Sequence, residues 1–219
     1  MVDRGLLQST ELFEGLDNEA LQRLAASTQS VELQRGDVVF AQGAVADHLY
    51  VMEDGIVAIV SKSDDGRESV FALMERGDLF GEMVLLDGLG RSAEARALEP
   101  AQVISIPYEV VHREFDAHPV LLWGVVSLLA GRLRSMDEAL ADSMFLDVAG
   151  RTAKRLLEMG GDLDEFVLPI TQEELASMVG ASRERVNKAI ASFVRLGWID
   201  QSERRYHILD RDQLTRRAR

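Results

Sequence analysis

One stretch of the chain, FGEMVLLDGLGRSAEARA, places an acidic and a basic side chain close to glycine-rich backbone. Glu82 follows Gly81 directly, and Arg91 comes nine residues later with Ser92 and Ala93 behind it. A glycine-rich loop presents backbone N–H groups, and an arginine with a serine adds the donors that a single phosphate requires. A carboxylate beside that phosphate makes sense if it accepts a hydrogen bond from a hydroxyl of the same ligand, such as a ribose 2′-OH. The stretch therefore predicts a nucleotide site.

A second stretch, TQEELASMVGASRERVNK, has the layout of a helix-turn-helix. Thr171 is placed to cap a first helix, and Glu174 three residues later would close a capping box. Gly180 would supply the tight turn, and Ser182 would cap a second helix. The following GWIDQSERRYHIL predicts two short strands around a basic tip, which is the wing of a winged helix.

The second helix of this motif would carry the base-reading side chains. Its outward positions are Arg183, Glu184, Asn187 and Lys188. Arginine and lysine donate to guanine, and glutamate accepts from cytosine, so this set suits G·C pairs. The side chains better placed for phosphates are Thr171, Gln172, Ser182 and Arg185. The alternative is a solvated helical face whose charges serve no ligand.

The elements that hold the first stretch are predicted to be short strands. After a helix expected over residues 12–28, residues 31–107 consist of brief apolar runs punctuated by glycine. LQRGDVVF at 33–40 resembles MERGDLF at 74–80, a weak repeat in which Gly-Asp makes a turn and the apolar residues re-enter a sheet. This pattern favours an antiparallel roll or sandwich.

A long helix is expected to follow Pro119. Apolar residues recur at alternating spacings of four and three, which is the a/d pattern of a coiled coil. They are Leu122, Val126, Leu129, Leu133, Met136 and Leu140. A homodimer through this helix is the economical interpretation, and burial against the chain's own β domain is the alternative. A further helix, capped by Asp147 and stopped at Gly160-Gly161, would open the last domain.

Composition narrows the function. The chain has no cysteine and only 4 histidines, which argues against thiolate zinc sites, iron–sulfur clusters and metal binding in general. We expect no metal and no enzymatic activity, since no paired carboxylates or Ser/His/Asp arrangement stand near the arginine. No stretch predicts a signal peptide or membrane span, so we expect a soluble cytoplasmic protein with no membrane partner.

The charge distribution predicts where a polyanion would bind. The net charge is −13, yet from Arg183 onward there are 10 basic residues against 5 acidic ones. Contact with DNA would therefore be confined to the C-terminal part of the chain.

These motifs, in this order, resemble the cyclic-AMP receptor (CRP/FNR) family of transcription regulators. The resemblance covers nearly the whole chain: the roll, FGE then RSA, the long helix, FLDV, and TQEELASMVGASRERVNK. It implies an α+β fold with a jelly-roll-like β-roll cyclic-nucleotide-binding domain over 1–118. A dimerisation helix would span 119–145, and a winged helix-turn-helix DNA-binding domain 146–219.

The resemblance also implies roles for individual residues. Gly81 and Glu82, with the neighbouring Met83, would bind the ribose side of a cyclic nucleotide. Arg91 and Ser92 would bind the cyclic phosphate, and Ala93 would offer backbone. Arg183, Glu184 and Lys188 fall on the base-reading positions. Lys188 stands where arginine is commoner, so we expect a TGTGA-like half-site with weaker innermost discrimination.

The long helix departs from the family pattern. Met136 and Asp137 occupy two positions where cyclic-AMP-responsive members commonly have hydroxyl residues that meet the adenine amine. Met136 is better explained as a seam residue. Asp137 could accept from adenine or, better, from the N–H pair of guanine. Cyclic AMP is the expected ligand, and cyclic GMP or weak responsiveness stay open.

The expected partners are double-stranded DNA, a second copy of the chain and, by the resemblance, RNA polymerase. The rival from another functional class is a cyclic-nucleotide-binding scaffold whose C-terminal domain binds protein instead of DNA.

Overall fold

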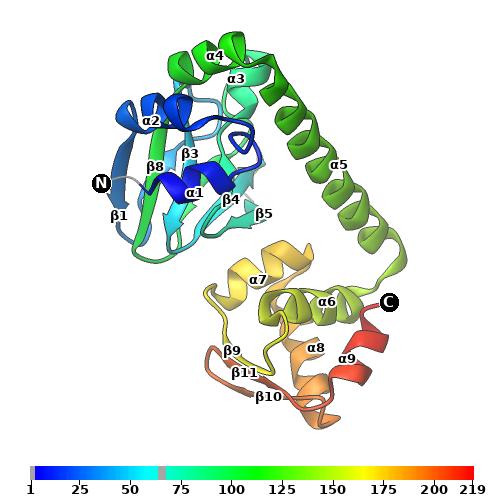
Figure 1. Ribbon diagram of the computed structural model, residues 1–219. Coiled ribbons are helices and arrows are strands. Elements are labelled where there is room, and N and C mark those ends of the chain that lie inside the picture. The colour runs from blue at the N-terminus through cyan, green and yellow to red at the C-terminus, as the bar shows by residue number, and fades with distance from the viewer. Residues whose placement is uncertain (1–2, 64–67) are drawn as a thin grey trace. The chain divides into compact units, whose positions relative to one another are not determined.

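The computed structural model of the chain describes residues 3–63 and 68–219. The chain divides into two compact units, Met1–Arg134 and Ser135–Arg219, and each is described by itself (Figure 1). The boundary falls within the long helix α5 (Leu122–Phe145).

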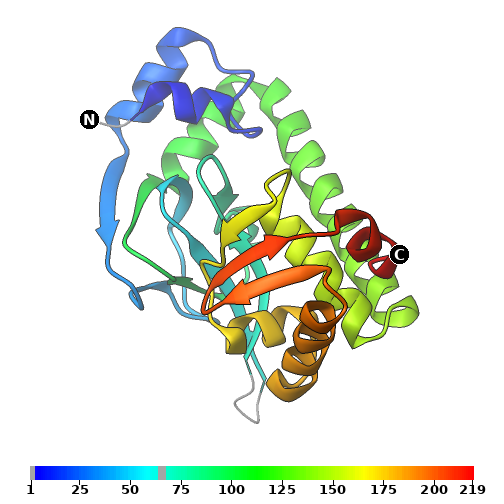
Figure 2. The same cartoon turned by 90° about the horizontal axis from the view of Figure 1, so that it is seen from below.

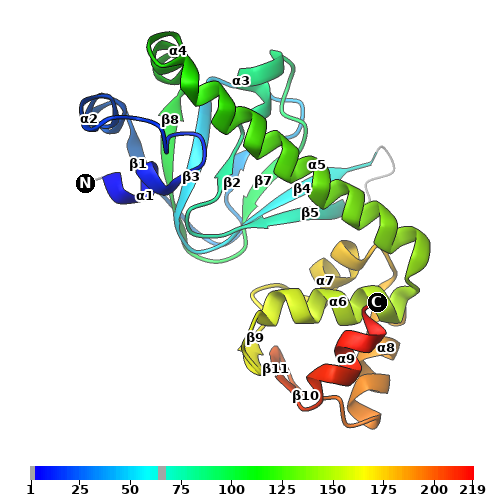
Figure 3. The ribbon, with the colours of Figure 1, turned by 45° about the vertical axis from the view of Figure 1, so that its right-hand side comes forward.

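The first unit is built on two antiparallel sheets, as the glycine-punctuated pattern predicts. One has the strand order β1-β8-β3-β6 and the other β2-β7-β4-β5 (Figure 3). The strands are β1 (Gln29–Leu33), β2 (Val38–Phe40), β3 (His48–Asp54), β4 (Val57–Lys62), β5 (Glu68–Met74), β6 (Leu79–Phe80), β7 (Glu94–Ala97) and β8 (Ala101–Pro107). The β-roll fold is confirmed.

The Arg-Gly-Asp repeat forms the same turn twice. Gly36 and Gly77 both have a positive φ, at 91° and 95°, which glycine adopts without a Cβ clash. Asp37 accepts from the Gln34 N–H at 2.8 Å, and Asp78 accepts from the Glu75 N–H at 2.8 Å. Each turn leads directly into a strand, β2 or β6. The turn interpretation of both triplets is confirmed.

Short helices cover the roll. They are α1 (Arg4–Ser9), α2 (Asn18–Ala26), α3 (Met83–Asp87), α4 (Tyr108–Ala117) and a 3₁₀ turn at Pro119–Leu121. The single helix expected over 12–28 is wrong at its start. Asp17 caps α2 by accepting from the Ala20 N–H at 2.8 Å, and the preceding residues form turns. Leu12 and Phe13 are nevertheless buried, so their apolar character reflects core packing and not a helical face.

Helix α5 carries two apolar stripes. Val125 is buried, and it packs with the partly buried Leu128 into the core of the roll. The predicted a/d residues face away and stay exposed within this chain. Their exposed fractions are Leu122 49%, Val126 52%, Leu129 40%, Leu133 60%, Met136 69% and Leu140 59%. For the four stripe residues that lie in the same unit as the roll, Leu122 to Leu133, the alternative of burial against the chain's own roll is therefore wrong.

The second unit is a winged helix-turn-helix. Its elements are α6 (Val148–Gly160), β9 (Glu165–Val167), α7 (Gln172–Val179), α8 (Arg183–Arg195), β10 (Ile199–Ser202), β11 (Arg205–Ile208) and α9 (Arg211–Arg217). Figure 2 shows β10 and β11 as neighbouring antiparallel arrows, the expected wing. The third strand, β9, pairs with β11 and was not anticipated, and neither was α9.

The predicted caps of this unit are present. Asp147 accepts from the Gly150 N–H at the start of α6, and Thr171 and Glu174 form the capping box of α7. Gly180 ends α7 with φ at 68°, and Ser182 caps α8. On α8, Val186, Ile190 and Phe193 form the buried face, and Val194 is 40% exposed. Within the described residues, no helix combines the length and apolar character needed to cross a membrane.

Candidate ligand cradle and DNA-reading helix

Arg91 lies in the loop between α3 and β7, and its side chain is buried in the roll. The residue is only 5% exposed. Its Nη1 donates to the Gly81 carbonyl at 2.6 Å and to the Tyr108 hydroxyl at 3.0 Å, and its Nη2 donates to the His48 carbonyl at 2.6 Å. Neither Tyr108 nor His48 was expected at this site from the sequence. They reach Arg91 from the start of α4 and from β3.

Aromatic rings pack against the guanidinium of Arg91. Its carbon lies 3.9 Å from the centre of the Phe40 ring and 5.7 Å from that of Tyr50. A guanidinium over an aromatic face is a cation–π contact. The Nε–H is also buried, yet it has no hydrogen-bond partner among the described residues. Arg91 is thus fixed in orientation while one of its donors stays unsatisfied.

Gly81 is required by this arrangement. Its φ is 81°, and a Cβ at this position would lie 2.6 Å from Arg91 Nη1 and 3.3 Å from the Phe40 ring. Glycine suits this position because it adopts the left-handed backbone conformation without strain and has no Cβ to clash with Arg91 and Phe40. The predicted pairing of Gly81 with Arg91 in one site is therefore a direct packing contact.

Tyr108 links the arginine to the glycine. Its hydroxyl donates to the Gly81 carbonyl at 2.5 Å while accepting from Arg91. Burial raises the pKa of Tyr108 to about 12, although the nearby Arg91 charge works in the opposite direction. The phenol therefore stays protonated and able to donate at physiological pH.

Glu82 is the most buried charge of the cradle, at 1% exposed. Its Oε1 lies 2.5 Å from Nη1 of Arg132, whose Nη2 donates to the Leu79 carbonyl at 2.9 Å. Burial raises the pKa of Glu82 above its ordinary value, and the neighbouring Arg132 and Arg91 charges oppose that rise. Arg132, which α5 brings to the cradle, was not expected there from the sequence.

The remaining predicted cradle residues differ in exposure. Ser92 is exposed beside Arg91, Ala93 is buried, and Met83 is half-buried in the first turn of α3. The loop offers fewer free N–H groups than its glycines suggested. Leu89 donates to the Asp87 carboxylate, and the backbone of Arg91 donates to the Ala44 carbonyl.

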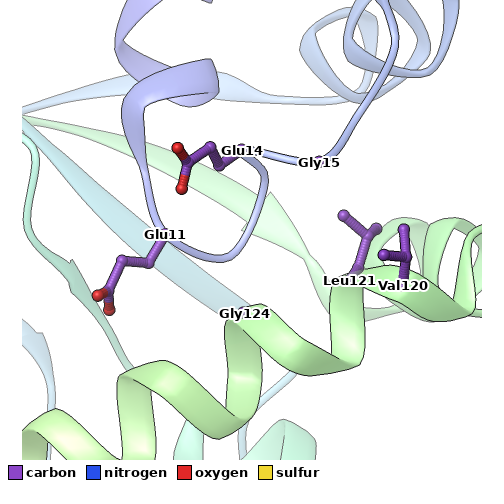
Figure 4. Close-up of a pocket in the computed structure, with 6 residues that line it drawn as sticks. All are labelled: Glu11, Glu14, Gly15, Val120, Leu121 and Gly124. Carbon is purple, nitrogen blue, oxygen red and sulfur yellow. The ribbon is translucent and has the colours of Figure 1, made fainter.

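Two hollows lie in the first unit. One of about 280 Å³ adjoins the outer side of the glycine loop and is lined by apolar residues, with Tyr108 and His112. The other, of about 240 Å³, is formed by the segment around Glu11 and Glu14 and the start of α5, as Figure 4 shows. Neither is lined by Arg91 or Ser92. Among the described residues, no cluster of three or more metal-ligating side chains occurs.

Met136 and Asp137 lie on the part of α5 that belongs to the second unit. Both side chains are exposed, and Met136 continues the a/d stripe. The proposed base contacts of these two residues stay predictions.

The side chains of α8 that are predicted to read DNA all face solvent. Arg183, Glu184, Asn187 and Lys188 are exposed, in agreement with the predicted outward face. Lys188 and Glu184 pair with each other at 2.8 Å across one helical turn. Both side chains are about three-quarters exposed, at 75% and 76%, so this pair is solvated and weak.

The predicted phosphate contacts lie at the start of the two helices. Thr171, Ser182 and Arg185 are exposed. Gln172 is half-buried, and its amide donates to the Tyr206 hydroxyl at 2.7 Å, which ties α7 to the wing. At the wing, Arg205 pairs with Glu165 at 2.9 Å.

Comparisons with known proteins match the parts of the chain that carry the two candidate sites. The family model described as "Cyclic nucleotide-binding domain" matches residues 30–118, and that described as "Crp-like helix-turn-helix domain" matches residues 150–217. A CRP-like cAMP-activated global transcriptional regulator of Mycobacterium tuberculosis is 36% identical over 98% of this chain and 99% of its own length. The cAMP-activated global transcriptional regulator CRP of Salmonella typhimurium is 33% identical, over 68% of this chain and 74% of its own.

The fold of this chain is also similar to that of a solved structure. FixK2 from Bradyrhizobium japonicum superposes with a TM-score of 0.79, covering 86% of this chain and 96% of that one. At 19% identity this match shows a common fold alone.

Together the matches define the class of the protein. It is a DNA-binding transcription regulator that responds to a cyclic nucleotide, and it is not an enzyme. The chain belongs to the CRP/FNR family of these regulators.

Proposed function

We propose that this chain is a homodimeric transcription regulator that cyclic AMP activates for binding to a TGTGA-like palindrome. It would act in the cytoplasm and contact RNA polymerase when bound to its site. Two relatives whose names state activation by cyclic AMP support this ligand, at 36% and 33% identity.

The observation that carries the proposal is the unsatisfied donor of Arg91. A buried donor without a partner costs free energy, and a phosphate oxygen is an acceptor that would relieve that cost. The other N–H contacts of Arg91 hold the guanidinium still, and Ser92 adds an exposed hydroxyl beside it. Glu82 would accept a hydrogen bond from the ribose hydroxyl, and Gly81, Met83 and Ala93 would line the rest of the ligand site.

Cyclic GMP is the alternative ligand, because Asp137 suits the adjacent N–H pair of guanine as well as the amine of adenine. A weakly responsive regulator is the other alternative, since Met136 offers no useful donor or acceptor.

Dimerisation is supported by the apolar stripe of α5, whose exposure would be costly in water. A dimer with two helix-turn-helix units would read two half-sites about 34 Å apart, one turn of DNA. Arg183, Glu184 and Lys188 would contact bases, and Thr171, Gln172, Ser182 and Arg185 would contact phosphates.

Calorimetric titration tests the ligand. We expect cyclic AMP to bind the wild type more tightly than cyclic GMP, and Arg91→Gln to lose at least about a hundredfold in affinity because a charged phosphate contact is removed. Arg113→Gln, which removes an exposed arginine of α4, is the matched control and should bind normally. Equal nucleotide affinity in the wild type and Arg91→Gln would refute the cradle.

A DNA titration tests the second half of the proposal. The affinity for a TGTGA palindrome should rise when cyclic AMP is added and fall steeply with salt, because basic side chains displace counterions from phosphates. A flat salt response, with nucleotide binding intact, would favour the scaffold that binds protein instead.

A further inference from the structure

The exposed stripe of α5 defines a coiled-coil register. Val126, Leu133 and Leu140 take the a positions, and Leu122, Leu129 and Met136 take the d positions. The residues on either side of this stripe are then the g and e positions, which in a coiled coil pair between helices and set their orientation.

One g–e pair in this helix carries opposite charges. The g positions of α5 are Val125, Arg132 and Ala139, and the e positions are Trp123, Ala130, Asp137 and Met144. In a parallel, in-register dimer, each g residue lies opposite the e residue five positions later on the other helix. Over residues 122–145, all of which the structure describes, the charged combination is Arg132 with Asp137, and the other g–e pairs are uncharged.

Arg132 is anchored on the side of the roll and still reaches solvent. Nη1 lies 2.5 Å from the Glu82 carboxylate and Nη2 donates to the Leu79 carbonyl, yet the side chain is 34% exposed. A guanidinium has five N–H donors, so these contacts leave others for a second carboxylate. Asp137 is exposed, and within the described chain it has no ion-pair partner of its own.

We propose that the partner subunit's Asp137 pairs with Arg132 across the dimer and so joins the network of Glu82 and Arg132. The proposal rests on the homodimer of the proposed function. It deepens that function by assigning Asp137 to the interface network of Glu82 and Arg132, not to recognition of the base. The charges also favour the parallel arrangement, because an antiparallel pairing brings e positions together and g positions together, so Arg132 and Asp137 would not face each other.

This arrangement couples the ligand to the dimer. Glu82 is the proposed ribose contact, and its carboxylate shares Arg132 with the partner subunit's Asp137. A ligand hydroxyl that donates to Glu82 weakens the hold of Glu82 on Arg132. The guanidinium is then freer to pair across the interface. The ligand thereby has a different affinity for the paired and unpaired helix arrangements, which is the requirement for an allosteric effect.

A double-mutant cycle on the full-length chain tests the pair. The dimer dissociation constant is measured by sedimentation, without nucleotide or DNA, for the wild type, Asp137→Ala, Arg132→Ala and the double variant. We expect Asp137→Ala to weaken the dimer by about two- to thirtyfold, since each dimer contains two partly exposed pairs. In the Arg132→Ala background the same change should have almost no effect, because its partner is already gone.

Glu138→Ala is the matched control, since it removes the same charge from the next residue, at the outward f position. It should leave the dissociation constant unchanged in both backgrounds. An equal effect of Asp137→Ala with and without Arg132, or no effect at all, would overturn the pairing, as would a monomeric wild type. A changed cyclic nucleotide affinity in Asp137→Ala with an unchanged dimer would instead assign Asp137 to the base.

The outcome is independent of the ligand proposal. Failure of cyclic nucleotides to bind the wild type would refute the proposed function while the cycle, run without nucleotide, still reports on the pair.

Discussion

The charges of the cradle and the charges of helix α8 have opposite surroundings. Arg91 and Glu82 are 5% and 1% exposed, and each is held by partners within the first unit. Lys188 and Glu184 have side chains that are 75% and 76% exposed, and they pair with each other in water. An unpaired charge in the first setting is strongly destabilising, whereas the second pair contributes little to stability.

This contrast distinguishes a candidate site whose side chains are fixed by the fold, the cradle, from one whose side chains are solvated, the outer face of α8. The roll orients Arg91 before any ligand arrives, so substitutions there should disturb folding and ligand binding together. The helix-turn-helix orients the backbone of α8, whereas the outer side chains of this helix are solvated and can change rotamer when they contact DNA. Substitutions on the outer face of α8 should therefore change DNA binding while leaving stability nearly constant.

The largest effect is expected from Gly81→Ala. The new Cβ would lie 2.6 Å from Arg91 Nη1 at a backbone φ of 81°, so both the arginine and the backbone must move. We expect the free energy of unfolding to fall by about 2–4 kcal/mol, together with the loss of nucleotide binding. Urea unfolding measures the first effect and calorimetry the second.

Gly88→Ala is the control for this prediction. Gly88 also has a positive φ, 70°, but a Cβ there meets nothing within 4 Å. Its cost should be about 1–2 kcal/mol, from backbone conformation alone. Equal losses for the two variants would show that packing on Arg91 is unimportant.

The next effect is expected from Arg183→Ala, at the exposed start of α8. Affinity for a site with a guanine at the contacted position should fall by about fivefold to a hundredfold, the range for one base contact. The unfolding free energy should change by less than about 0.5 kcal/mol, because the side chain is outside the core. Arg195→Ala, in the last turn of the same helix, should affect neither, and an equal loss of affinity there would contradict specific readout.

A smaller effect, a gain in base discrimination, is expected from Lys188→Arg. Arginine donates in a fork that matches guanine, whereas lysine acts as a compact point charge. Discrimination against a substituted innermost G·C pair should therefore increase, by about tenfold at most. Competition binding with the two DNA sites measures the ratio, and an unchanged ratio would mean that Lys188 does not read this base pair.

The smallest effect concerns pH and Glu82→Gln. Because burial raises the pKa of Glu82 in the folded state, the native protein binds its proton at a higher pH than the unfolded chain does. The wild type should therefore lose stability relative to Glu82→Gln as pH rises through and above 4.5, and regain it on acidification. Urea unfolding of both proteins between pH 4 and 7 gives the difference. A difference that does not vary with pH would contradict the raised pKa.

Local features were predictable to a large extent. The two Gly-Asp turns, the capping box of Thr171, the caps at Asp147 and Ser182, and the turn at Gly180 are all present. Each depends on residues at most three positions apart, so a short stretch contains the whole interaction. The helix expected over 12–28 begins only at Asn18, because the apolar residues before it pack into the core from turns.

The cradle was predictable only in part. Gly81, Glu82 and Arg91 stand close together in the chain, and glycine-rich spacing was enough to select them. The groups that fix them come from farther away: the Arg91 contact with His48 spans 43 residues, and the Arg132 contact with Leu79 spans 53. Tyr108 and Arg132 carried no local signal, since a tyrosine before a helix and an arginine on a long helix are ordinary features.

By itself, the sequence determined the order of elements, the turn and cap chemistry, the charged outer face of α8 and the a/d stripe of α5, because these depend on residue type and short spacing. The tertiary structure decided which way Arg91 points, which donor it leaves unsatisfied and which arginine meets Glu82. Those choices arise where β3, α4 and α5 converge on one loop, and burial there requires every charge to find a partner.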